Sequence, residues 1–282
     1  MSEHAEARRL RLLEELREDG AGRELADFAR QLQVDERTIR RDVDYLQQLL
    51  SSINGIEMAR GRVFAGRDAF APGYFADQLD AKKGAKQAIA RRVVEGLDDN
   101  VAVIITAGST TFYVAREIRR SHVEGSHPRN LIALTNSLPA LLELISAGVS
   151  TGVVGEVFNP DDRAFQSTEL RTTFHPNLAI VGASGLVADL QAGELKLFSH
   201  RAEEAAFMKQ LLAPIPEIVV ATDATKVGRR HPWAFTDRSI LADKNVRLVT
   251  NTLESKERED LSRLSEMAPR NGWQFEFEET RS

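Results

Sequence analysis

Residues 101–113, VAVIITAGSTTFY, determine the fold of most of this chain. The run VAVIIT (101–106) is apolar and uninterrupted, and a turn of small polar residues, Gly108 to Thr111, follows it. A short continuous apolar run is typical of a strand buried on both faces, as strands of a parallel sheet are. Because a helical stretch (112–120) comes next, these residues predict a strand–turn–helix unit of an α/β domain.

The same pattern recurs along the chain. Further apolar runs that predict strands are LIALT (131–135), TGVVGEVF (151–158), LAIVG (178–182), EIVVAT (217–222) and VRLVT (246–250). A first helix is expected at about 77–97, a last helix over 255–267 and a final strand over 273–279. Strands that alternate with helical stretches predict a larger doubly wound, mostly parallel α/β domain, which we place at 77–282.

The first part of the chain has a different pattern. Leucines at helical spacing predict helices over 5–19 and 23–33, and a third helix follows from Glu36 to about Leu50. Residues 53–64 read as a two-stranded hairpin. Three helices and a hairpin predict a winged helix-turn-helix domain over 1–66, and the turn-rich residues 67–76 are the expected linker.

The third helix presents an arginine-rich face. Ile39, Val43 and Leu46 share one side, which is the expected buried stripe. The residues that lie opposite the stripe or on its flanks are the candidates for DNA binding: Arg37, Thr38, Arg40, Arg41 and Tyr45. Arginine can bond bidentately to guanine in the major groove, and threonine can reach a phosphate or a thymine methyl. The alternative is that this face is merely solvated.

Small and polar residues follow four of the predicted strands. Ligands of parallel sheets bind beyond the carboxyl ends of the strands, so these residues are the candidate ligand site. They are Gly108, Ser109, Thr110, Thr111, Asn136, Ser137, Gly182, Ser184, Gly185, Asp223 and Lys226. A turn rich in N–H groups and hydroxyls at a helix N-terminus can bind phosphate. The alternative is that the turns are helix caps and that Lys226 is a surface lysine.

The amino-acid composition excludes several classes of protein and of binding site. The net charge is −5, which argues against non-specific binding of nucleic acid over the whole surface. The absence of cysteine excludes disulfides and thiolate metal sites, and the histidines lack paired metal spacing, so we expect no metal and no cofactor. The N-terminus has no apolar signal region and no run is long enough to span a membrane. We therefore expect a cytoplasmic protein.

The third predicted helix resembles a known family. VDERTIRRDVDYL (34–46) is similar to the recognition helix of DeoR-family transcription regulators, in which an S-x-x-T-I-R-R-D-L pattern recurs. Asp35 stands in place of the serine and keeps the capping chemistry. The resemblance implies that Thr38, Arg40 and Arg41 lie on the DNA-facing helix and that Asp42 orients a neighbouring arginine. It also implies a wing, where Arg60 and Arg62 are candidate DNA contacts.

The resemblance extends into the second domain. The family's D-x-G-T-T, T-N-S, glycine-rich and D-S-S-K-F-G segments correspond to Thr106–Thr111, Thr135–Ser137, Gly182–Gly185 and Asp223–Gly228. The family's effector domain is similar to ribose-phosphate isomerases and coenzyme A transferases, and it senses phosphorylated sugars. Two departures, Thr106 in place of an acid and Gly155-Glu156 in place of two glycines, bear on which sugar is recognised.

The resemblance implies a homo-oligomeric regulator, usually a repressor, that binds double-stranded operator DNA under the control of a phosphorylated sugar. The alternative is an isomerase-like enzyme with an accessory helical domain, because the same fold also carries isomerisation. In that case Asp223 and Lys226, or the carboxylates of Glu203 and Glu204, are the candidate acid and base.

Overall fold

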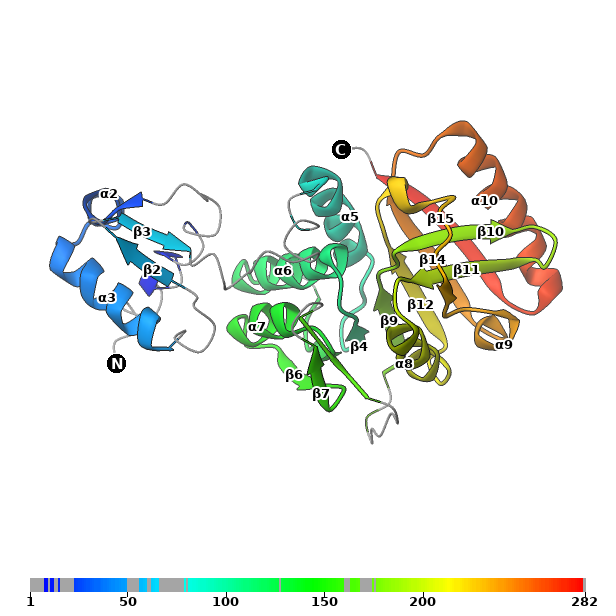
Figure 1. Cartoon of the computed structure of the whole chain (residues 1–282), viewed down its shortest axis with the longest axis horizontal. Coiled ribbons are helices and arrows are strands. Elements are labelled where there is room, and N and C mark those ends of the chain that lie inside the picture. The colour runs from blue at the N-terminus through cyan, green and yellow to red at the C-terminus, as the bar shows by residue number, and fades with distance from the viewer. Residues whose placement is uncertain are drawn as a thin grey trace. The chain divides into compact units, whose positions relative to one another are not determined.

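The computed structural model of the chain describes residues 8–9, 11–12, 15, 23–49, 56–59, 62–65, 79, 81–126, 128–159, 163–167, 174 and 176–280. The chain divides into two compact units, Met1–Asp77 and Gln78–Ser282 (Figure 1). Within the described residues, no helix is both long and apolar enough to cross a membrane.

The first unit forms helices and a small antiparallel sheet in its described residues, of which residues 8–9, 11–12 and 15 are helical in the region predicted as the first helix. Its elements are β1 (Arg23–Glu24), α2 (Leu25–Gln31), α3 (Glu36–Leu49), β2 (Ile56–Ala59) and β3 (Arg62–Ala65), and the strand order is β1-β3-β2. The helix expected over 23–33 begins later, because Arg23 and Glu24 pair with Val63 and Arg62 of β3 instead. The backbone pairing satisfies their polar groups outside the helix.

Apolar side chains from the helices and from β3 form the core of the first unit. The fully buried members are Leu12, Leu25, Phe28, Ala29, Ile39, Val43, Leu46 and Val63. The stripe predicted for the third helix, Ile39, Val43 and Leu46, is therefore its buried face, and the opposite face of α3 is left to solvent.

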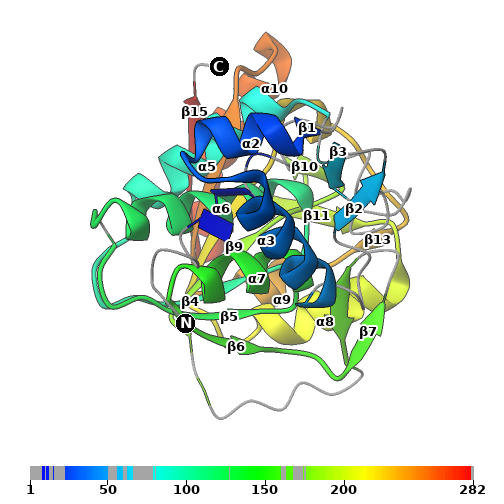
Figure 2. The same cartoon turned by 90° about the vertical axis from the view of Figure 1, so that its left-hand side faces the viewer.

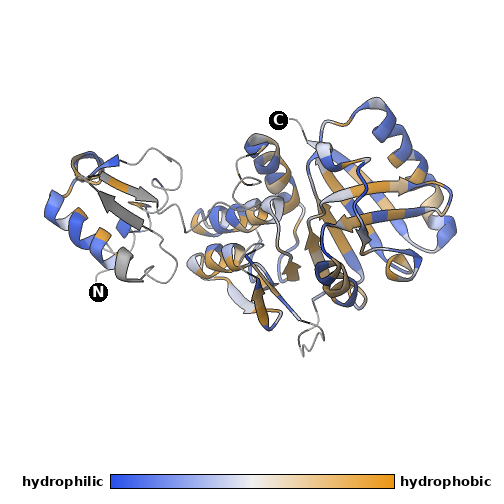
Figure 3. Ribbon diagram, viewed as in Figure 1, coloured by the Kyte–Doolittle hydropathy of each residue, from blue (hydrophilic) through white to orange (hydrophobic). Residues whose placement is uncertain are grey.

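The second unit is built on a seven-stranded sheet in which every neighbouring pair is parallel. Its order is β15-β14-β12-β9-β4-β5-β6. The strands are β4 (Ala102–Ile105), β5 (Ile132–Thr135), β6 (Ser150–Val153), β9 (Leu178–Val181), β12 (Glu217–Ala221), β14 (Asn245–Asn251) and β15 (Gln274–Thr280). The apolar colouring of the central strands in Figure 3 reflects burial on both faces.

Helices cover both faces of this sheet. They are α5 (Lys83–Glu95), α6 (Ser109–Val123), α7 (Leu138–Ser146), α8 (Ala202–Leu212), α9 (Arg238–Leu241) and α10 (Ser255–Met267), with short 3₁₀ turns η2 (Ala224–Lys226) and η3 (Ala268–Asn271). α5, α6 and α7 lie on one face and α8 and α10 on the other (Figures 1 and 2). This is the expected doubly wound α/β class, and the prediction of that class is confirmed.

The direction of winding reverses in the middle of the sheet. From β4 the chain proceeds outward to β5 and β6, and it then returns to β9 and continues the other way through β12, β14 and β15. In such folds the loops at the carboxyl ends of the two strands beside the reversal point separate and leave room for a ligand. Here those strands are β4 and β9.

Two smaller sheets were not expected from the sequence. β10 (Gly185–Asp189), β11 (Glu194–Ser199) and β13 (Trp233–Ala234) form an antiparallel sheet of order β10-β11-β13. The single strand predicted over 151–158 is wrong: its first part is β6, whereas Val157–Asn159 (β7) pairs with Ala164–Gln166 (β8). Gly155, at a φ of 106°, separates the two, because such a backbone angle ends the first strand.

Candidate functional site

The exposed face of α3 is formed by the arginines that the sequence singled out. Arg37, Arg40 and Arg41 are exposed, and Thr38 is half-buried. Asp35 begins the helix: its carboxylate accepts a hydrogen bond of 2.7 Å from the backbone N–H of Thr38. This bond is the first cause of the lowered pKa of Asp35, and it fixes the start of α3.

Asp42 lies on the opposite side of α3 and is 2% exposed. Its two carboxylate oxygens accept hydrogen bonds from the Nε atoms of Arg8 at 2.5 Å and Arg9 at 2.7 Å. The guanidinium of Arg9 also lies 3.8 Å from the centre of the Tyr45 ring. Tyr45, a predicted DNA contact, is therefore packed beneath an arginine, and Asp42 anchors the N-terminal residues to α3.

We expect Asp42→Ala to destabilise the first unit by about 1–2 kcal/mol, because two charged hydrogen bonds are lost while both arginines can still reach water. Urea unfolding of the full chain measures this change. The exposed Asp44 of the same helix provides the matched control, since Asp44→Ala removes an equal charge with no buried bond. Equal stability of the two variants would contradict the anchoring role.

The predicted wing residues are Arg60 and Arg62. Arg60 lies outside the described residues, and Arg62 is described as a backbone position of β3 that pairs with Ala59 of β2 and Glu24 of β1. A wing strand is thus present at Arg62, and a DNA contact by either arginine stays a prediction.

At the carboxyl edge of the large sheet, the loops that follow neighbouring strands are joined directly. The backbone N–H of Gly182, after β9, donates to the hydroxyl of Thr106, after β4, at 3.3 Å. The backbone N–H of Ala107 donates to the side-chain oxygen of Asn136, after β5, at 2.7 Å. The structure therefore brings three of the four predicted segments together at one edge.

The turn after β4 provides the N-terminus of α6. Gly108 precedes the helix at a φ of 149°, a backbone angle that favours glycine. The next three residues, Ser109, Thr110 and Thr111, form the first turn and are at most 5% exposed. Thr111 donates its hydroxyl to the Gly108 carbonyl at 3.1 Å. The Thr110 hydroxyl is buried without a hydrogen-bond partner, so it can bond a ligand that reaches the turn.

Asn136 and Ser137 already have partners within the protein. The Asn136 amide nitrogen donates to the Phe165 carbonyl at 3.1 Å, in addition to the bond from Ala107. The Ser137 hydroxyl accepts from the Ala140 N–H at 3.3 Å and caps α7. These two residues are 3% and 1% exposed, so they position the loops rather than offer free groups to a ligand.

The turn after β9, from Gly182 to Gly185, packs against the segment that follows Lys226. A Cβ atom on Gly185 would lie 2.5 Å from the Arg229 carbonyl oxygen, so glycine is required for this close approach. The Gly228 N–H donates to the Leu186 carbonyl at 2.8 Å, which fixes the segment beside the turn. Ser184 lies in this turn and is half-buried.

The fourth segment supplies opposite charges. Asp223 is 3% exposed, and one of its oxygens accepts from the backbone N–H and the hydroxyl of Thr225. The Lys226 ammonium lies 4.0 Å from the other Asp223 oxygen. Burial lowers the pKa of Lys226, and the nearby carboxylates of Asp223 and Glu204 partly oppose this shift. A buried ammonium this far from its counter-ion is well suited to binding an anion.

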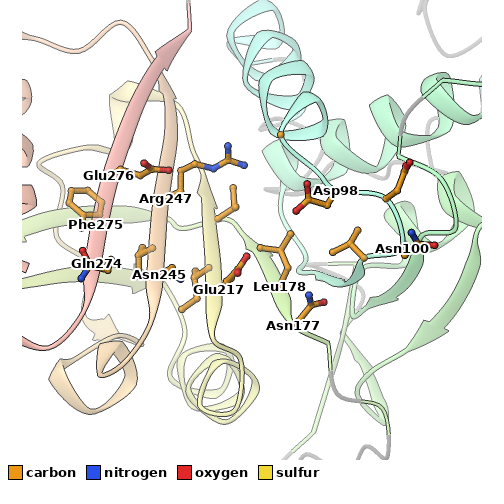
Figure 4. A pocket seen from close by; sticks show the side chains of 16 residues that line it. Asp98, Asn100, Asn177, Leu178, Glu217, Asn245, Arg247, Gln274, Phe275 and Glu276 are labelled. Carbon is orange, nitrogen blue, oxygen red and sulfur yellow. The ribbon is translucent and has the colours of Figure 1, made fainter. Parts of the chain in front are cut away.

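A separate pocket of about 620 Å³ lies at the other edge of the sheet (Figure 4). Leu178, Glu217, Asn245 and Gln274 are the first residues of β9, β12, β14 and β15, and Asp98 and Asn100 lie beside them before β4. None of the predicted ligand residues lines this pocket. Its walls carry mainly carboxylate and amide groups and do not include the hydroxyl-rich turns of the carboxyl edge.

No group of three or more histidine, cysteine or carboxylate side chains suited to a metal ion occurs among the residues that the structure describes. The polar groups gathered at the carboxyl edge are N–H groups, hydroxyls, an ammonium and a carboxylate. Those groups bind phosphate and sugar hydroxyls.

Comparison with known proteins gives three findings. Residues 81–242 match the family model described as the DeoR C terminal sensor domain. The chain is 27% identical over 262 residues to an HTH-type transcriptional regulator, GlpR, of Haloferax volcanii, covering 90% of this chain and 94% of that protein. It is 25% identical over 253 residues to a protein of Escherichia coli O157:H7 named as an aga operon transcriptional repressor, covering 85% and 86%.

Among solved structures, a ribose 5-phosphate isomerase from Plasmodium falciparum superposes with a TM-score of 0.38 at 17% identity, covering 50% of this chain and 52% of that one. A similarity at that level does not bear on activity.

Proposed function

Because this chain belongs to the DeoR family of transcriptional regulators, we propose that a phosphorylated sugar binds at the carboxyl edge of its large sheet and controls its affinity for operator DNA. Membership of the family favours the regulator over the isomerase-like enzyme. The observation that carries the ligand assignment is the buried, unpartnered Thr110 hydroxyl in the first turn of α6.

In this proposal the phosphate accepts hydrogen bonds from the N–H groups and hydroxyls of the Gly108–Thr111 turn, where the positive end of the helix dipole favours an anion. Asp223 and Lys226 bind the rest of the ligand, while Asn136, Ser137, Gly182, Ser184 and Gly185 shape the loops around it. Thr106, where the family has an acid, is 1% exposed, and its hydroxyl accepts the Gly182 N–H and so joins two loops. No carboxylate at this position is available to bind sugar hydroxyls.

On the DNA side, we propose that residues 1–66 form the DNA-binding domain, 67–76 the linker and 77–282 the effector and oligomerisation domain. Arg37, Thr38, Arg40 and Arg41 face the major groove, with Arg60 and Arg62 on the wing. Two or more subunits present their α3 helices to repeated half-sites. The protein acts as a repressor, and the ligand acts through unequal affinity for DNA-competent and DNA-incompetent arrangements.

The direct test is a thermal-shift screen of the full chain against phosphorylated sugars, with the unphosphorylated sugars as controls. A ligand present at about 100 times its Kd adds about 2.7 kcal/mol to the free energy of unfolding. We expect shifts with phosphorylated compounds alone. An assay for isomerised product on each hit tests the enzyme alternative, and measured turnover would favour it.

The role of Thr110 gives a sharper prediction. Thr110→Val removes a hydroxyl that has no partner, so the ligand-free protein should be at least as stable as the wild type. Loss of a hydrogen bond to a charged phosphate should weaken sugar-phosphate binding by about tenfold. Calorimetric titration and thermal unfolding measure the two effects.

Thr250→Val is the matched control for this variant, because Thr250 at the end of β14 is also buried with an unpartnered hydroxyl. It should change stability in the same direction and leave the Kd alone. If Thr110→Val binds the sugar phosphate with a wild-type Kd, the phosphate does not bind at this turn.

A further inference from the structure

Two histidines from separate segments meet beside the candidate ligand site. His200 directly follows β11, and His231 lies two residues before the start of β13 at Trp233. Pairing of Ser199 with Trp233 brings them together, and their ring centres lie 4.0 Å apart in an edge-to-face arrangement. This contact depends on a small sheet that the sequence pattern did not reveal.

The histidine pair lies against two residues of the candidate site. The Nε2 atom of His231 is 3.1 Å from the carbonyl oxygen of Ser184, and its ring abuts the position of Gly185. The segment between Lys226 and His231 is fixed beside this turn by the bond from Gly228 to Leu186. The imidazoles therefore border the same edge of the sheet as the Lys226 ammonium.

Groups that can carry a positive charge gather at this position. The pKa of His200 is lowered first by burial and then by the charges of His231, Lys226 and Arg201. The carboxylates that act on Lys226 are Asp223 and Glu204, of which Asp223 is held by Thr225 and Glu204 by the Ser199 hydroxyl. A bound anion would favour the protonated form of His200 and so oppose the lowering of its pKa.

This cluster of Lys226, His200 and His231 is distinct from the turn after β4 that is proposed to bind phosphate. Lys226 follows β12, and β12 and β4 are separated by β9 in the sheet. Two strand spacings correspond to about 10 Å. The chain of a pentose or hexose places groups at its two ends over a comparable span.

We propose that the effector carries two anionic groups, a phosphate held at the Gly108–Thr111 turn and a second phosphate or a carboxylate held by Lys226, His200 and His231. The inference rests on the proposed function and specifies its ligand class as a sugar bisphosphate or a phosphorylated sugar acid. His200 and His231 make the protein prefer an effector that carries this second anionic group.

The test uses calorimetric titration of the full chain with matched sets of pentose and hexose compounds. Each set contains a monophosphate, the bisphosphate of the same sugar and the corresponding phosphorylated acid, for example glucose 6-phosphate and 6-phosphogluconate. We expect one set in which a doubly anionic member binds at least about tenfold more tightly than the monophosphate. Comparison of the bisphosphate with the acid identifies which anion the subsite takes.

The double variant His200→Asn, His231→Asn should lose this preference. His122→Asn, on α6, replaces the described histidine that lies outside the cluster and should retain it. A second readout is proton uptake on binding at neutral pH, measured in buffers of different ionisation enthalpy. An anion raises the lowered pKa of His200, so the wild type should take up more protons than the double variant.

The outcomes separate this inference from the function on which it rests. Monophosphates that bind as tightly as their doubly anionic partners, or a double variant that keeps the preference, would overturn the second subsite alone. Failure of every phosphorylated compound to bind would overturn the sugar-phosphate proposal together with it.

Discussion

Lys226→Met is expected to abolish the response of DNA binding to the phosphorylated sugar. The Lys226 side chain is 16% exposed, and its ammonium lies 4.0 Å from the nearer Asp223 oxygen, so it can bond a second anion. Hydrogen bonds to charged groups contribute about 1.5–3 kcal/mol, and losing one weakens binding by roughly 10- to 150-fold. Methionine fills similar space without the charge, but it leaves the buried Asp223 carboxylate without its counter-ion and should lower stability, so thermal unfolding is measured beside the DNA response.

Operator binding measured with and without ligand tests this expectation, and the ligand-free affinity is the internal control. The exposed Lys256 of α10 offers a matched charge, so Lys256→Met should keep a normal response. A full response by Lys226→Met would mean that the ligand site lies elsewhere.

The same lysine predicts how effector affinity depends on pH. Burial lowers the pKa of Lys226 below its ordinary value of 10.5, and only the protonated form attracts an anion. Effector binding should therefore be strong below the lowered pKa and decline as the pH rises through it. Titrations of wild type and Lys226→Met over alkaline pH should show the decline in the wild type alone.

Arg41→Ala should weaken operator binding by about 1–3 kcal/mol and relax specificity at one base position. Arg41 is exposed on α3, opposite the buried residues Ile39 and Val43, so its loss leaves the helix and its core intact. Sugar-phosphate binding should not change. Fluorescence anisotropy with the operator and with single-base variants measures both effects.

The exposed Arg91 on α5 provides a control of equal charge in the other unit, and Arg91→Ala should leave operator affinity unchanged. The single-base variants show whether Arg41 contacts a base or a phosphate. Loss of a phosphate contact would lower the affinity about equally for all DNA sequences and reduce the salt dependence of binding. If Arg41→Ala binds the operator as tightly as the wild type, Arg41 does not contact the DNA bases.

The sequence predicted the large sheet well because burial on both faces leaves little freedom in strand composition. The runs at 101–106, 178–182 and 217–222 correspond to β4, β9 and β12 with end shifts of a residue or so. The helix predicted over Ser255–Met267 has the same bounds as α10. Continuous apolar runs and strong helical periodicity both follow from position in the core.

The elements that were missed depend on contacts between distant residues. β11 alternates polar and apolar residues over Glu194–Leu197, and the ion pair between Lys196 and Asp189 of β10 lies on the partly exposed side of this hairpin. The meeting of His200 and His231 follows from one short pairing between β11 and β13. Neither the pairing nor the contact leaves a local signal in composition.

In the candidate ligand site, the sequence placed the segments correctly at strand ends, since parallel strands bring such turns to one edge. It did not separate residues that offer free groups from residues that hold the loops. Thr110 has an unpartnered hydroxyl, whereas the amide of Asn136 is bonded on both sides. That difference depends on the partners, which only the folded chain defines.

The bonds made by Asn136 have a consequence for the speed of sensing. One amide joins the turn before α6 to Phe165 of β8, so the turn proposed to bind phosphate is held in place by bonds within the protein itself. A preformed site loses little ordering entropy on binding. Ligand capture should then be limited by diffusion and charge rather than by loop closure, and the slower step should be the rearrangement that releases DNA.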